Sequence, residues 1–146
     1  MTPARRTGVR RRRGSSLIEF AFVSFMLMIT ALAAFEFSRM IIVYTTVANA
    51  ARISVRYAIV HGATRTGTGV NGPSGPGATT NIENVVKNYA DLLNVSQLSI
   101  TVTYPDTLNT PGSRVAVTVT YLYDPFTTFL PLRINLGSKT QGVIAF

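Results

Sequence analysis

The chain has 146 residues, of which 47% are hydrophobic, with no cysteine and a formal net charge of +8. The absence of cysteine excludes disulfides and thiolate chemistry, so an exported domain would have to hold together by packing alone. Six of the fourteen Lys and Arg residues lie in the first fourteen positions, which contain no acid. The basic charge therefore belongs mainly to an N-terminal leader.

An apolar run follows this leader. It is uncharged from Phe20 to Phe35, and the wider stretch from Leu17 to Phe37 contains only Glu19 and Glu36, near its two ends. About 20 helical residues cross the hydrocarbon core of a bilayer. The stretch is therefore long enough to form a transmembrane helix in contact with membrane lipid.

The arginines of the leader predict orientation rather than nucleic acid binding. Basic arms that bind nucleic acid need a binding module beside them, whereas these arginines adjoin the apolar run, so no nucleic acid partner is expected. A basic flank favours a cytoplasmic N-terminus and export of the chain that follows the membrane segment. The arginines nearest to that segment are Arg10, Arg11, Arg12 and Arg13.

An ordinary signal peptide is an alternative interpretation of the same stretch. Its apolar core would extend from Phe20 to Thr30, and cleavage after Ala31-Leu32-Ala33 would release a soluble protein. Glu19 argues against this interpretation, because a signal peptide has no use for a carboxylate at the start of its apolar core.

The apolar pattern continues beyond Phe37 in alternating steps of four and three residues, which predict one face of a helix. No Gly or Pro lies between Ser15 and His61, so we expect one helix over residues 15–61 with an amphipathic outer half. The apolar face is interpreted either as core packing or as a subunit contact in a fibre, and the pattern leaves both open. Its members are Phe37, Ile41, Tyr44, Ala48, Ala51, Val55 and Ala58.

A loop and a short helix are predicted next. Glycines and prolines in residues 62–80 indicate a flexible loop. A helix is expected from Thr80 to Leu93, with Thr80 as the N-cap and Glu83 completing a capping box.

The remaining chain predicts antiparallel strands. Apolar residues alternate with small or polar ones in residues 98–104 and again in residues 115–123, as in strands with one buried face. A third strand is expected within residues 133–146, in which Gly137 and Gly142 mark breaks.

Residues that usually perform catalysis are scarce. The sequence has one His, no Cys and six acids in separate places, so we expect no enzyme, no metal site and no cofactor. His61 is best explained as a residue at the C-terminus of the long helix, where it interacts with the helix dipole. Aromatic residues near Asp124 and Pro125 form either a binding surface or structural packing; they are Tyr121, Tyr123, Phe126 and Phe129.

Several short segments resemble one family of pilus proteins, the TadE-like pseudopilins of the bacterial tight-adherence (Tad) system. The resemblance covers roughly residues 14–60. The segments that carry it are RGSSLIEFA at Arg13 to Ala21, EFSR at Glu36 to Arg39, NAAR at Asn49 to Arg52, and RYA at Arg56 to Ala58.

This resemblance implies a processing site and an assembly site. In that family a prepilin peptidase cuts after the glycine, which is Gly14 here, and exposes Ser15 as the new amino terminus. Glu19 is then five residues into the mature chain, and Glu19 with Phe20 would act in assembly. The implied partners are the prepilin peptidase, other pilins or pseudopilins and the pilus assembly machinery.

The predicted fold class is α+β and resembles that of type IV pilins, with a long N-terminal helix, one short helix and an antiparallel sheet of three or four strands. We expect a single-pass protein of the bacterial inner membrane, needed for biogenesis or assembly of a Tad-type pilus and present in the extracellular pilus after assembly. The alternative is a membrane-anchored or secreted binding module with an ordinary signal sequence. The predicted regions are a cytoplasmic basic leader (1–14), a transmembrane helix (15–37), its amphipathic extension (38–61), a Gly/Pro-rich loop (62–80) and a periplasmic α+β head (81–146).

Overall fold

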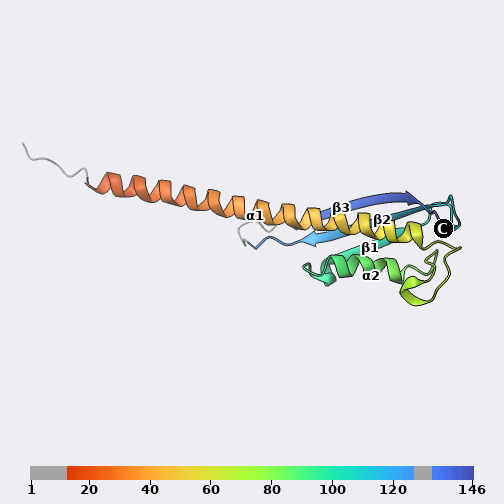
Figure 1. Ribbon diagram of the computed structural model, residues 1–146. Helices are drawn as coiled ribbons and strands as arrows, with labels where there is room; N and C mark the ends of the chain where they lie inside the picture. Colours follow the sequence, from red (N-terminus) through yellow and green to blue (C-terminus); the bar gives the residue numbers. More distant parts are fainter. Residues whose placement is uncertain (1–12, 127–132) are drawn as a thin grey trace, which may run out of the picture. The chain divides into compact units, whose positions relative to one another are not determined.

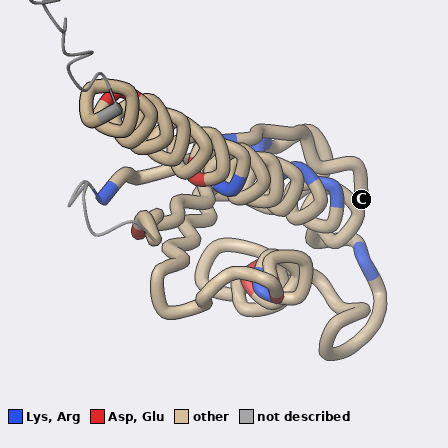
Figure 2. Tube along the Cα trace, turned by 90° about the vertical axis from the view of Figure 1, so that its left-hand side faces the viewer, with Lys and Arg blue, Asp and Glu red and all other residues tan. Residues whose placement is uncertain are grey.

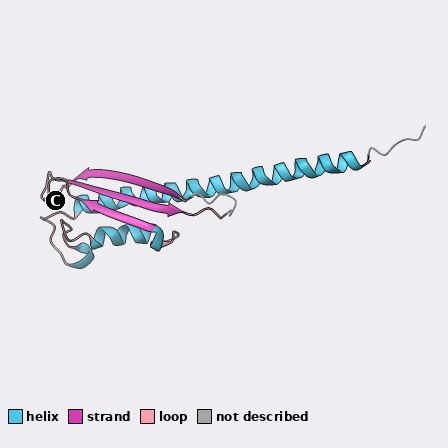
Figure 3. Ribbon diagram, turned by 180° about the vertical axis from the view of Figure 1, so that it is seen from behind, coloured by secondary structure: helices cyan, strands magenta, loops and turns pink. Residues whose placement is uncertain are grey.

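The computed structural model describes residues 13–126 and 133–146, with only the backbone of Arg13. The predicted leader residues Arg10, Arg11 and Arg12, and the aromatic residue Phe129, lie outside the described residues. The fold is α+β, as predicted, and the described residues form a sheet of three strands (Figure 1, Figure 3). The elements are α1 (Arg13–Val60), α2 (Thr80–Tyr89), β1 (Leu98–Thr103), β2 (Arg114–Tyr123) and β3 (Ile134–Val143), with short 3-10 turns at Gly69–Asn71 and Val95–Gln97.

The chain divides into two compact units, Met1–Phe37 and Ser38–Phe146. In the first unit the helical surface is apolar on all sides, and large side chains such as Leu17, Phe20 and Leu27 are more than two-thirds exposed. Within the described residues α1 is the one helix that is long and apolar enough to cross a membrane. Such a surface suits the hydrocarbon of a membrane, because exposed apolar patches of this size are rare on soluble proteins.

In the second unit α1 buries one face against the sheet. Val47, Ala50 and Ala51 are fully buried, and Ser54 is buried with its hydroxyl donating to the Ala51 carbonyl at 2.9 Å. Small side chains let the helix and the sheet approach closely, and each fully buried valine stabilises the fold by about 1.5 to 3 kcal/mol relative to an exposed one. This face is therefore part of the core of the second unit.

The predicted apolar face of α1 is right for its later turns and wrong for its earlier ones. Ala51, Val55 and Ala58 are buried, but Ile41 is 45% exposed and Tyr44 is 50% exposed. Phe37, at the end of the first unit, is 59% exposed. Residues 40–44 are all apolar, so hydrophobicity alone does not select a face there.

The sheet is antiparallel in the order β1-β2-β3. The central strand β2 places Val115, Val117 and Val119 in the core, where they are fully buried. In the register of the sheet, Val117 pairs with Val102 of β1 and Thr140 of β3. Helix α2 adds Ile82 and Val86 to the same core cluster, so one core joins both helices and all three strands.

Gly137 and Gly142 do not break the third strand, contrary to the prediction, since β3 runs through both. Gly142 lies against α1: a Cβ there would be 2.6 Å from Ile59 Cδ1 and 2.8 Å from Val55 Cγ1. A strand residue without a side chain is needed where a sheet approaches another element this closely. The glycine therefore serves packing rather than chain termination.

Helix α2 is shorter than predicted and begins with a different cap. Thr79, not Thr80, occupies the N-cap position, and its hydroxyl donates to Glu83 Oε1 at 2.7 Å rather than capping the backbone. The helix ends at Tyr89, after which the chain turns so that Leu93 packs on the core while Leu92 stays 93% exposed. The apolar spacing does not reveal this turn.

Residues 62–80, expected to be a flexible loop, form specific hydrogen bonds with the rest of the unit. The Ser74 amide donates to the His61 carbonyl at 2.7 Å, and the Tyr57 hydroxyl donates to the Val70 carbonyl. The Asn109 side chain donates to the Ser74 carbonyl at 3.1 Å, which connects the loop to the β1–β2 connection. The composition of the loop predicted its turns but not these contacts.

Gly62 marks the place where three segments meet. The C-terminal residues return to the end of α1, where the Ala145 amide donates to the Ile59 carbonyl at 3.0 Å. A Cβ on Gly62 would clash with the Phe146 carbonyl and with Ile144, and would lie 2.8 Å from the Asn109 carbonyl. Backbone atoms cannot move aside as a flexible side chain can.

We therefore expect Gly62→Ala to destabilise the second unit by at least about 2 kcal/mol, as overpacking does elsewhere. Denaturant unfolding of the full chain in detergent, followed by the near-ultraviolet circular dichroism of its buried tyrosines, measures this effect. The matched control is Gly137→Ala, because a Cβ there meets its nearest atom at an ordinary 3.4 Å. Equal midpoints for the two variants would contradict the close approach at Gly62.

Candidate processing and assembly site

The predicted processing junction lies in the first two turns of α1. The helix begins at Arg13, so Gly14, Ser15 and Glu19 are all helical, and their side-chain positions are exposed. Among the described residues, no atom outside the neighbouring residues and the backbone of the same turn lies within 4 Å of a Cβ built on Gly14. The junction is therefore sterically open on its own helix.

Ser15 and Glu19 are four residues apart and so lie on the same helical face, one turn apart. Long helical side chains lean toward the N-terminus, which directs the Glu19 carboxylate toward position 15. An amino terminus created at Ser15 would be within reach of this carboxylate. The helix therefore places Ser15, which the resemblance assigned to processing, one turn from Glu19, which it assigned to assembly.

The residues on either side of Glu19 in the sequence are apolar. Its neighbours Ile18 and Phe20 are 74% and 71% exposed, and the described residues include no ion-pair partner for Glu19. An ionisable side chain in an apolar helix is costly in a membrane and marks a functional position by default. Among the described residues no group of His, Cys, Asp and Glu side chains could hold a metal ion.

His61 is a structural residue at the end of α1. Its side chain is buried, its ring stacks on that of Tyr57 at 3.8 Å between centroids, and its Nδ1 lies 2.8 Å from the Tyr57 carbonyl oxygen. The contact requires a proton on Nδ1, which then donates to a carbonyl of the last helical turn. This arrangement matches the predicted role at the helix C-terminus.

The aromatic residues near Asp124 do not form one binding surface. Tyr121 and Tyr123 are 7% and 2% exposed, because their positions on β2 point into the core, whereas Phe126 is 80% exposed. The Arg39 guanidinium lies over the Tyr123 ring at 5.3 Å. For the two tyrosines, structural packing is therefore the correct interpretation.

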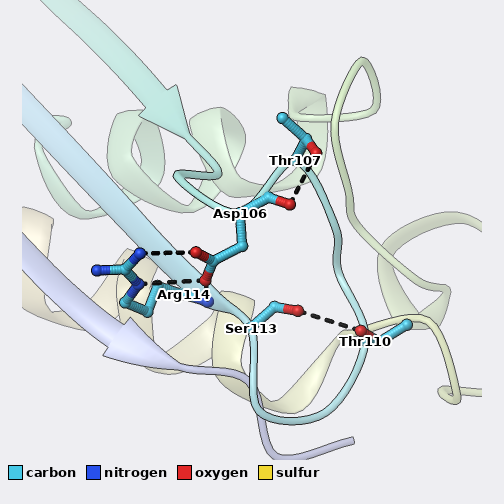
Figure 4. A network of polar contacts seen from close by, with 5 residues as sticks. All are labelled: Asp106, Thr107, Thr110, Ser113 and Arg114. Carbon is cyan, nitrogen blue, oxygen red and sulfur yellow. Dashed lines mark hydrogen bonds and ion pairs between the residues drawn. The ribbon is translucent and has the colours of Figure 1, made fainter.

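A polar network that the sequence did not reveal holds the connection between β1 and β2 (Figure 4). Asp106 accepts from the Arg114 backbone amide at 2.8 Å and from its guanidinium at 2.6 and 3.2 Å. These hydrogen bonds lower the pKa of Asp106 to about 2 and raise that of Arg114. The only sequence signal is an acid and an arginine eight residues apart across a Pro and Gly turn.

Nearby, burial raises the pKa of the Tyr104 hydroxyl to about 12. The Asp106–Arg114 pair stabilises the turn between β1 and β2, and Tyr104 packs against the core of the second unit. Neither belongs to the junction at Gly14.

The long apolar helix and the three-stranded second unit define a membrane-anchored α+β protein of pilin-like architecture. Residues 14–56 match the family of TadE-like proteins. This match confirms the resemblance seen in the sequence: over these residues the chain is similar to TadE-like proteins. No curated protein and no solved structure matches the chain significantly.

The Asp106–Arg114 pair predicts a pH-dependent contribution to stability. Because the folded pKa of Asp106 is below its ordinary value of 3.8, the contribution is present above about pH 4 and is lost as the pH falls through about 2. We expect Asp106→Asn to lower the thermal midpoint at pH 7, and the difference from the unmodified chain to become small near pH 2. Asp91→Asn, at an exposed acid, serves as the control. A difference that persists undiminished at pH 2 would contradict this assignment.

Proposed function

We propose that the chain is a prepilin-like structural subunit that is processed after Gly14 and needed for assembly of a Tad-type pilus. The observation that carries the proposal is the position of the family match, which begins at Gly14, between the arginine-rich leader and the apolar helix. A site for recognition and cleavage is expected at such a boundary, because the leader stays in the cytoplasm while the helix enters the bilayer.

Processing would be the first step of the mechanism. The peptidase cuts the Gly14–Ser15 bond and gives Ser15 a cationic amino group at the start of α1. The absence of a side chain on Gly14 suits a narrow peptidase site. The single-pass topology, with a cytoplasmic leader and an exported second unit, follows from the arginines and is part of the proposal.

Extraction of the helix from the bilayer would be the second step. An ionised carboxylate at the centre of a membrane helix costs about 3 kcal/mol, and less near an end. Pairing of Glu19 with the new amino terminus, its own or that of a neighbouring subunit, offsets this cost. The pair thereby favours packing of α1 among other pilin helices over isolation in lipid.

The second candidate function is a membrane-anchored or secreted binding module. A signal peptidase would then cut after Ala33, and the protein would leave the membrane. The exposed Phe126 in the second unit is the observation that favours a binding role. The position of the amino terminus distinguishes the two functions.

We expect the mature chain to start at Ser15 in cells that contain a prepilin peptidase. Intact mass and amino-terminal sequencing of the membrane-extracted protein measure this directly. Gly14→Phe should abolish cleavage without disturbing the helix, because the space around Gly14 is open. A mature chain beginning at Ala34, or one that retains its arginines, would rule out the proposed processing.

We further expect Glu19→Ala to be cleaved normally but to be poorly recovered in sheared pilus fractions. Loss of one partner from a buried ion pair costs about 3 to 5 kcal/mol, because the other charge is left uncompensated. Glu19→Asp should show a partial defect, since its shorter stem reaches the amino terminus poorly.

Ser16→Ala is the matched control for these variants, as it removes a polar group from the same turn. Normal recovery of processed Glu19→Ala would show that Glu19 is only an interfacial residue and would overturn the second step.

A further inference from the structure

Two arginines stand together on the outer face of α1 in the second unit. Arg52 and Arg56 are both exposed and lie one turn apart, on the side of the helix opposite Val47 and Ser54, which are buried. Exposed Thr45 lies on the same face, two turns before Arg52. Figure 2 shows basic residues along this part of α1.

Neither arginine is neutralised within the described part of the chain. Arg52 donates to the Asn49 side chain at 3.5 Å, and no ion pair of either arginine is found there. Two other arginines of the second unit form ion pairs, Arg114 with Asp106 and Arg133 with Asp124. Like charges four residues apart on a helix repel weakly, and a carboxylate that approaches from outside would relieve this repulsion.

A second copy of the same face does not supply that carboxylate. The sequence from Ser38 to Val60 contains no Asp and no Glu, so a copy packed alongside in register brings arginine against arginine. The family match extends to Arg56 and therefore includes both residues. A guanidinium binds a carboxylate through two parallel hydrogen bonds, which makes such a contact selective as well as attractive.

We propose that the face of α1 that carries Arg52 and Arg56 binds a helix of a different pilus subunit. That helix presents Asp or Glu side chains opposite the two arginines. This inference rests on the proposed function and adds the chemistry of the partner. The apolar residues of α1 contact neighbouring helices without distinguishing between them. The arginine pair determines which subunit binds. Like-charge repulsion against the wrong partner gives such an interface its selectivity.

The test places a photo-crosslinking amino acid at Thr45 of the full chain, in cells that contain the other pilus subunits. The arginines stay intact because Thr45 is uncharged and two turns away. We expect an adduct with a different pilus subunit, mapped by mass spectrometry to a segment that contains Asp or Glu. Arg52→Glu combined with Arg56→Glu should reduce the adduct about tenfold or more.

The matched control is Lys87→Glu combined with Lys139→Glu, which changes the net charge by the same amount. Lys87 is on α2, and Lys139 pairs with Thr118 on the sheet face opposite the buried valines of β2. This variant should crosslink as the unmodified chain does. Replacing the mapped carboxylates of the partner by arginine should restore the adduct of the Arg52→Glu, Arg56→Glu chain.

Other outcomes overturn the inference. They are an adduct mainly with a second copy of this chain, an adduct with phospholipid, an adduct insensitive to the arginines, or no adduct in a chain recovered with pili. Amino-terminal sequencing of the same samples tests the proposed function separately. A chain cut at Ser15 but crosslinked only to itself would leave that function standing and reject the arginine interface.

Discussion

Helix α1 has to satisfy two environments, and the rest of the structure depends on how its side chains do so. Up to Phe37 its surface is apolar on every side, which suits lipid, because a helix satisfies its own backbone hydrogen bonds. From Ser38 onward only one face is buried, and that face consists largely of small residues such as Ala50 and Ala51. The change in surface, rather than a break in the helix, separates the two units of the chain.

Close packing on the small face of α1 determines the form of the second unit. The sheet approaches the helix so closely that Gly142 leaves no room for a side chain against Val55 and Ile59. At the end of the helix the C-terminal residues pass over Gly62 and bond to the Ile59 carbonyl. The C-terminal residues thereby supply a hydrogen-bond donor to a carbonyl at the end of α1. This contact holds the second unit together without cysteine.

Charge in this protein lies at surfaces and ends. Glu19 lies one turn from the proposed new amino terminus, and Asp106 with Arg114 holds an exposed turn. Arg52 and Arg56 have no carboxylate partner within the described residues. Glu19, Arg52 and Arg56 are therefore available for contacts with other molecules, which agrees with the structural subunit of a Tad-type pilus that we propose.

The sequence by itself predicted the long apolar helix and the α+β class, because apolar periodicity and charge flanks are local properties of the chain. It also located the strands, since alternation marks a half-buried strand wherever it pairs. Tertiary structure alone decided that Val47 rather than Tyr44 is buried, and that β3 runs through Gly142. It also joined Asp106 to Arg114. These features depend on contacts between segments that are distant in the sequence. The apolar pattern and the glycine content do not specify which of these segments pack against each other.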